Sequence, residues 1–165
     1  DTITELVKVR SGKLAALLHE KRVAGRGDQL QVTTEVAIDI LDDHKKGFFL
    51  MVEGSEIDGG GHDNDMAYTI EEMLDFDRAV GKALEFAARN RRTLVVVTAD
   101  HETGGLTLVN GDIGKGMVTG RFSTTGHTGI MVPVFAYGPG AEQFGGIDEN
   151  TSFFNKFIEL LKLNK

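Results

Sequence analysis

Apolar side chains recur every three or four residues in three stretches of the chain, a spacing that predicts amphipathic helices. The first stretch covers residues 33–46, and Gly47 follows it in the position where glycine commonly ends a helix. The second, the clearest helix in the sequence, covers residues 69–89. It opens on Thr69 and Glu72, which have the spacing of a capping box.

The third helical stretch lies near the C-terminal end, with Thr151 as its expected cap. Its apolar residues should form one buried face: Phe154, Phe157, Ile158 and Leu161. At the other end of the chain, residues 1–30 are poorly assigned by pattern. Within them, residues 14–18 are compatible with a short helix.

Short continuous apolar runs predict three buried strands. They cover residues 48–52, 94–97 and 132–136, and Pro133 places the last one at a strand start or near a sheet edge. Because a helix separates the first two runs, we expect a βαβ unit with parallel pairing and a right-handed crossover.

Residues 102–131 form a glycine-punctuated excursion between the second and third predicted strands, with short strands near 106–109 and 117–122. A chain of 165 residues is long enough for one domain with its own core. We therefore predict a single α/β domain, residues 1–165, with a mostly parallel sheet.

Polar residues with metal-binding chemistry follow the first predicted strand. Asp58 and His62 are four residues apart, and open α/β sheets place ligand sites at the carboxyl ends of their strands. Three consecutive glycines between them disfavour a regular helix, since each costs about 1 kcal/mol relative to Ala. We expect a tight loop that brings both side chains to one point.

Asp100 and His101 follow the second predicted strand, and parallel pairing would place them on the same rim of the sheet as the first cluster. His127 precedes the third strand. A catalytic zinc ion takes three protein ligands from His and carboxylates and keeps one position open, which Asp58, His62 and His127 would satisfy. Asp100 and His101 supply only part of a second zinc site.

Each of these features also has a simpler interpretation. A single Asp or His in a loop is usually a turn residue or a surface group, and His19 and His44 are interpreted as surface groups. Some polar residues near the clusters could touch substrate but are better explained as partners of loop backbone groups: Glu102, Thr103, Ser123 and Thr124.

Composition narrows the choice of ligands and partners. The net charge of −7 argues against nucleic acid, although bound metal ions could still attract a phosphorylated small molecule. The chain has no Cys, so any metal must be held by His and carboxylates. No apolar run approaches the roughly 18–20 residues of a membrane span, and no segment has the pattern of a signal peptide.

Taken together, these motifs closely resemble the alkaline phosphatase family. The segments that carry the resemblance are Gly47–Asp58, His62, Val97–Gly105, His127–Gly129 and Ala136–Gly140. Their order and intervals also match, and the similarity runs from about Thr33 to the end of the chain. The resemblance implies a partial three-layer α/β sandwich and hydrolysis of phosphate monoesters.

The resemblance also implies a ligand set for two zinc ions and one magnesium ion. The first zinc would be held by Asp58, His62 and His127. Asp100 and His101 would be two ligands of the second zinc, and Glu53 would be one ligand of the magnesium, a cation that prefers oxygen. Relatives are mostly exported, so a periplasmic or extracellular location is expected.

The sequence departs from the family pattern in one main respect. The family's serine nucleophile follows an Asp in the N-terminal half, and no such segment is found here, nor the Asp that bridges two metals or the phosphate-clamping Arg. We therefore expect a C-terminal fragment, inactive alone, that self-associates or pairs with the missing half. Gly59 and Gly60 also replace side chains that often lie over the site in relatives.

Two alternative functions remain open at the level of sequence. One is another two-metal hydrolase of the same superfamily: a sulfatase, a phosphodiesterase or a phosphoglycerate mutase. The other is a zinc-binding module without catalysis, which would bind a single zinc ion and show no affinity for phosphate.

Overall fold

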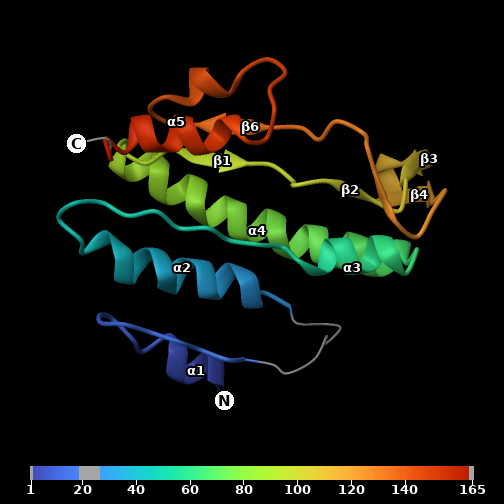
Figure 1. The fold of residues 1–165 in the computed structure, drawn as a ribbon. Coiled ribbons are helices and arrows are strands. Elements are labelled where there is room, and N and C mark those ends of the chain that lie inside the picture. The colour runs from blue at the N-terminus through green and yellow to red at the C-terminus, as the bar shows by residue number, and fades with distance from the viewer. Residues whose placement is uncertain (1, 19–26, 164–165) are drawn as a thin grey trace. The chain divides into compact units, whose positions relative to one another are not determined.

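The computed structural model describes residues 2–18 and 27–163 as an α/β structure, drawn in Figure 1. The α-helices are α1 (Thr2–Leu6), α2 (Gln29–Asp42), α3 (Glu56–His62), α4 (Met66–Asn90) and α5 (Ser152–Leu160). The strands are β1 (Val95–Val97), β2 (Glu102–Thr103), β3 (Thr107–Asp112), β4 (Met117–Arg121), β5 (His127–Thr128) and β6 (Phe135–Tyr137). Short 3₁₀ helices are η1 (Ile113–Lys115) and η2 (Ala141–Phe144).

The chain forms two compact units. The first unit consists of residues 1–83 and 103–128, and the second of residues 84–102 and 129–165. The boundary falls within α4. No helix among the described residues is long and apolar enough to cross a membrane.

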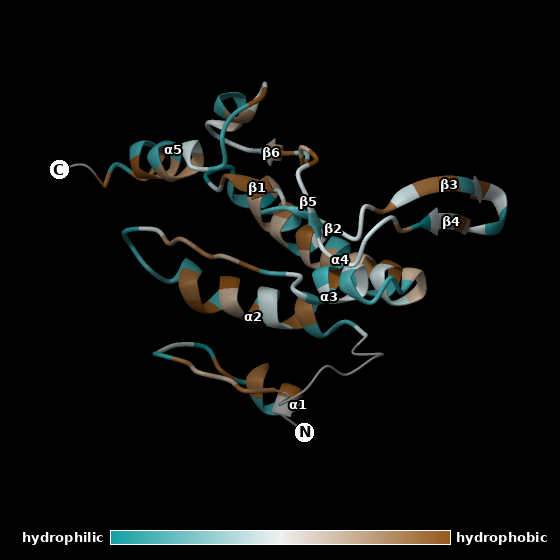
Figure 2. Ribbon diagram, turned by 45° about the vertical axis from the view of Figure 1, so that its right-hand side comes forward, coloured by the Kyte–Doolittle hydropathy of each residue, from teal (hydrophilic) through white to brown (hydrophobic). Residues whose placement is uncertain are grey.

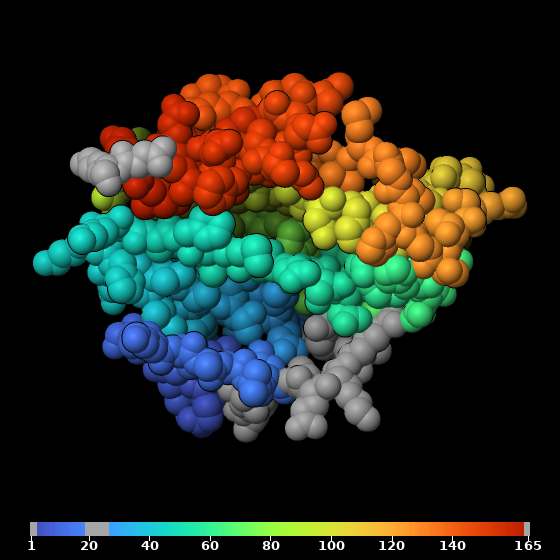
Figure 3. Space-filling model, viewed as in Figure 1, coloured from blue at the N-terminus to red at the C-terminus, as the bar shows by residue number. Residues whose placement is uncertain are grey.

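The core of the first unit lies between α1 and α2. Leu6, Val36 and Ile40 are buried together, and Leu18 packs against them. Figure 3 shows the N-terminal segment in blue against the atoms of α2. The helix considered for residues 14–18 is wrong, because that segment is irregular and the helical turn lies at α1 instead.

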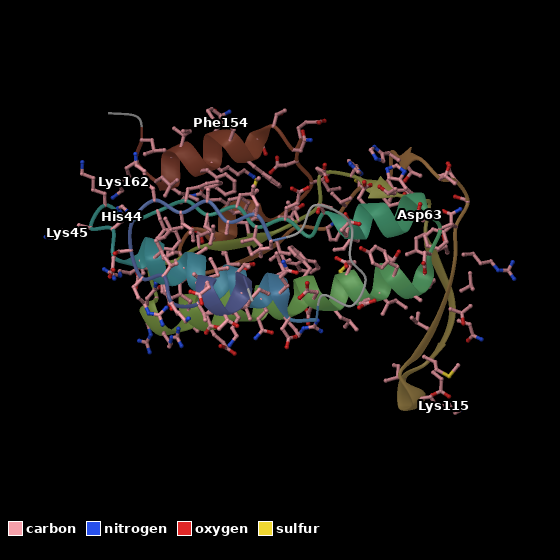
Figure 4. The ribbon with its side chains drawn as sticks, turned by 90° about the horizontal axis from the view of Figure 1, so that it is seen from below. His44, Lys45, Asp63, Lys115, Phe154 and Lys162 are labelled. Carbon is pink, nitrogen blue, oxygen red and sulfur yellow. The ribbon has the colours of Figure 1, made fainter. Side chains whose placement is uncertain are left out.

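Two predicted helices are confirmed, with shifted ends. Helix α2 ends at Asp42, so Gly47 (φ +82°) lies in the following loop, where Figure 4 labels His44 and Lys45. Helix α4 begins at Met66, and the capping box at Thr69 is wrong. Asp65 caps this helix instead, because its Oδ1 accepts from the Tyr68 N–H at 3.0 Å and its carbonyl accepts from the Thr69 hydroxyl at 2.8 Å.

The excursion predicted over residues 102–131 contains an antiparallel hairpin of β3 and β4, which confirms its two short strands. Gly116 turns the chain with a left-handed backbone at φ +61°. Figure 2 shows apolar residues along β3, and Leu108 and Val109 are exposed there. Lys115 lies at the tip of this hairpin (Figure 4).

In the second unit, β1 and β6 confirm two predicted strands but pair antiparallel, with Val96 opposite Ala136. The predicted strand over residues 48–52 is wrong. That segment has no strand, and Met51 is exposed. An apolar run favours extended backbone, but a strand also needs a neighbour for its hydrogen bonds. Because residues 48–52 form no strand, they do not pair with β1, and the predicted parallel βαβ unit is absent from the described residues.

Helix α5 packs on η2 through aromatic rings. Phe144 is buried, and the ring centroids of Phe153 and Phe157 each lie 5.7 Å from that of Phe144. Thr151 occupies the predicted N-cap position but makes no side-chain capping bond. Phe154 is 68% exposed and Leu161 is 42% exposed, so their predicted places on the buried face are wrong.

Candidate metal centre

The glycine-rich segment after residue 55 is helical. Helix α3 covers Glu56–His62, so the predicted tight loop is wrong. Because residues four apart lie on one face of a helix, Asp58 and His62 project to the same side. The side chains converge as the sequence predicted, although by helical geometry and not by a loop turn.

Close packing on two sides explains two of the three glycines in this helix, Gly60 and Gly61. A Cβ atom at Gly60 would lie 2.5 Å from Thr69 Oγ1 on α4, and a Cβ at Gly61 would lie 2.9 Å from the carbonyl oxygen of Thr103. Figure 1 shows α3 beside the first turns of α4. Glycine's lower helix propensity is thus offset by backbone contacts that any side chain would block.

This packing predicts opposite effects for two glycine substitutions. Gly60→Ala should lower the free energy of unfolding by about 1–3 kcal/mol, because its new methyl group overlaps Thr69. Gly81→Ala, inside α4 with open space around its Cβ position, should raise it by about 0.5–1 kcal/mol. Urea denaturation measures both. Equal effects would contradict the packing assigned to Gly60.

The His62 imidazole is oriented by a backbone carbonyl. Its Nδ1 lies 2.6 Å from the carbonyl oxygen of Thr125, which can only accept a hydrogen bond. The Nδ1 atom therefore carries the proton and donates it. In the neutral ring, this leaves the Nε2 lone pair available for a ligand, as in most histidine metal ligands.

Strand β5 brings the third side chain to this point. His127 Nε2 lies 3.1 Å from His62 Nε2 and 3.5 Å from Asp58 Oδ1, and His62 Nε2 lies 3.4 Å from Asp58 Oδ2. Tetrahedral zinc with bonds of 2.0–2.1 Å separates its ligand atoms by about 3.3 Å. The three separations therefore fit ligands that share one small cation.

The loop that carries His127 is tied back to Gly104. The Gly104 N–H donates to the Gly126 carbonyl at 2.9 Å, and the Gly104 carbonyl accepts from the Ser123 N–H at 2.9 Å. The Asp58, His62 and His127 side chains remain 42–49% exposed. The cluster is thus held from one side and open to solvent on the other.

The other predicted ligands are not members of this three-residue cluster. Asp100 and His101 belong to the second unit, where His101 Nε2 lies 3.3 Å from Asp100 Oδ2. Glu53 is an exposed residue before α3. Their convergence with the first cluster on second zinc and magnesium sites stays a prediction.

Sequence reasoning missed one residue of this cluster. Thr103 was assigned to the loop backbone, but its hydroxyl donates to Asp58 Oδ1 at 2.5 Å. Thr124 fits the backbone assignment, because its hydroxyl accepts from the Gly126 N–H at 3.1 Å. Position 103 lies two residues after a candidate ligand, His101, and that proximity was the available signal.

Comparisons with known proteins show which family the chain belongs to. The family model described as alkaline phosphatase matches residues 20–121. Alkaline phosphatase 4 of Bacillus subtilis is 33% identical over 203 residues, covering 82% of this chain and 44% of the relative. Streptomycin-6-phosphate phosphatase of Streptomyces griseus is 41% identical over 167 residues, covering 86% and 37%.

Solved structures give the same result. Alkaline phosphatase from the Antarctic bacterium TAB5 is similar with a TM-score of 0.78 and 46% identity, covering 86% of this chain and 43% of that one. A cold-active alkaline phosphatase from Shewanella sp. has a TM-score of 0.87 at 26% identity, covering 96% and 58%. The chain thus spans less than half the length of the curated relatives named above.

Proposed function

This chain belongs to the alkaline phosphatase family, and from that premise we propose that it contributes the zinc-binding part of a phosphate monoester hydrolase. Asp58, His62 and His127 are the three protein ligands in this proposal. The observation that carries it is the placement of their ligand atoms, all within 4.8 Å of one another.

The donor set fits zinc. Two imidazoles and one carboxylate are common ligands of catalytic zinc, and three protein ligands leave a coordination position for substrate or water. A zinc ion there would supply Lewis-acid polarisation of a phosphoryl oxygen. The chain's own residues hold the ligand atoms together and keep one side of the cluster open to solvent.

Family membership extends the proposal to further metals. Asp100 and His101 are proposed as part of a second zinc site, and Glu53 as one magnesium ligand. A TAB5 alkaline phosphatase variant has been solved with Mg bound in its M3 site, which supports magnesium as a family cofactor.

The nucleophile is proposed to come from outside this chain. The four serines are Ser11, Ser55, Ser123 and Ser152, and none follows an Asp. Exposed apolar residues support a partner segment: Met51, Ile130, Met131 and Phe135 are each at least 63% exposed. We propose that this chain is the C-terminal part of one domain. Its partner is either that domain's missing half, which completes a mostly parallel three-layer sandwich, or a second copy. An exported location is proposed from the family alone.

Metal analysis tests the central proposal. The purified chain is first stripped of metal, then reloaded with excess zinc and desalted. It should then retain at least one zinc ion per chain, as measured by plasma mass spectrometry. Inorganic phosphate should then bind to the zinc-loaded chain and not to the stripped chain. Zinc binding without phosphate affinity would favour a module without catalysis. Zinc at background level would refute the metal centre.

A further inference from the structure

We infer that Thr103 is a positioning residue for the Asp58 carboxylate, an inference that rests on the proposed zinc centre. The Thr103 hydroxyl donates to Asp58 Oδ1 at 2.5 Å, a bond between residues 45 positions apart in the chain. A hydrogen bond from a hydroxyl to an ionised carboxylate is stronger than one between neutral groups.

The hydroxyl restricts a torsion that is otherwise loosely defined. The terminal torsion of an Asp side chain is broad, so helix geometry alone directs the Asp58 Cβ atom but not the two carboxylate oxygens. Thr103 holds Oδ1, and Oδ2 then lies 3.4 Å from His62 Nε2. The bond thus selects the rotation in which the carboxylate faces the imidazoles.

The approach of Thr103 to α3 depends on two glycines. A Cβ atom at Gly61 would lie 3.0 Å from Thr103 Cβ, and a Cβ at Gly104 would lie 2.8 Å from the Gly61 carbonyl oxygen. Gly104 also has φ +89°, a conformation that favours glycine. The backbone is therefore shaped to bring the Thr103 hydroxyl within reach of Asp58.

His62 and Asp58 each have a partner outside the ligand set. Thr125 fixes the His62 ring through its carbonyl, and Thr103 fixes Asp58 through its hydroxyl. Such partners raise metal affinity because the ligands do not have to be ordered when the metal binds. Removing one typically weakens metal binding about 10–100-fold.

The test compares zinc affinity among variants of the full chain by competition with a chromophoric chelator. Thr103→Val keeps the shape of the side chain and removes the hydroxyl, so zinc affinity should fall about 10–100-fold. Thr103→Ser keeps the hydroxyl and should remain close to wild type. Thr119→Val, at an exposed position on β4, is the matched control and should change nothing.

Each outcome has a defined meaning. Wild-type affinity in Thr103→Val would overturn this inference and leave the zinc centre intact. A Thr103→Ser variant as weak as Thr103→Val would assign Thr103 to packing, which also overturns it. Wild-type chain without zinc affinity would refute the zinc centre and the inference together. If circular dichroism shows that Thr103→Val does not fold, Thr103→Ala replaces it in the comparison of zinc affinity with Thr103→Ser.

Discussion

Purified chain alone should hydrolyse p-nitrophenyl phosphate about a million-fold more slowly than TAB5 alkaline phosphatase assayed beside it. The reason is the absence of an Asp-Ser segment from the sequence, since removing a serine nucleophile reduces turnover by about this factor in a hydrolase. Zinc bound at Asp58, His62 and His127 would not replace the covalent step. Release of p-nitrophenolate, followed with zinc and magnesium present, measures the rate.

Contaminating host phosphatase requires a control in that assay. Asp58→Asn, purified in the same way, should show the same residual rate as the wild-type chain, because we expect neither chain to perform the reaction. Rapid hydrolysis that accompanies the wild-type chain and disappears in Asp58→Asn would show that the chain is active by itself. That result would contradict the proposed need for a segment outside this chain.

Removing either histidine of the cluster should weaken zinc binding by more than about 100-fold. Loss of a direct ligand is expected to exceed the 10–100-fold effect of losing an outer partner. His62→Ala also leaves the Thr125 carbonyl without its donor, and His127→Ala removes the ligand supplied by β5. Titration of metal-free chain with zinc, followed by calorimetry, measures both variants.

His44→Ala is the matched control for those substitutions. His44 is exposed beyond the end of α2, where Figure 4 labels it, and its removal should leave zinc affinity unchanged. Circular dichroism verifies that each variant keeps its helices. An equal loss of affinity in His44→Ala and His127→Ala would indicate nonspecific binding to histidines and would contradict the assigned site.

The sequence predicted the ligand cluster better than it predicted the backbone that forms it. Asp58, His62 and His127 were grouped from their residue types and their places next to apolar runs, and the structure brings them together. The tight loop expected between Asp58 and His62 is part of a helix, because glycine propensity was weighed without the contacts of Gly60 and Gly61. Those contacts involve residues 69 and 103, which a local pattern cannot include.

Strand pairing shows the same limit. Two of the predicted strands, now β1 and β6, were recognised as short continuous apolar runs. Their antiparallel pairing was not predicted, and the run at residues 48–52 is not a strand among the described residues. Hydrogen-bonded pairing depends on which segments meet in space, and an apolar run does not encode its partner.

By itself, the sequence predicted helices α2 and α4 with shifted ends, a set of proposed metal ligands, and the family that the motifs resemble. Only the tertiary structure decided that α3 is helical, that Thr125 orients His62, and that Thr103 bonds to Asp58. Helical periodicity is a property of neighbouring residues and is readable along the chain. The bonds from Thr103 and Thr125 span 45 and 63 positions, and their geometry arises only when the packed backbone brings those segments together.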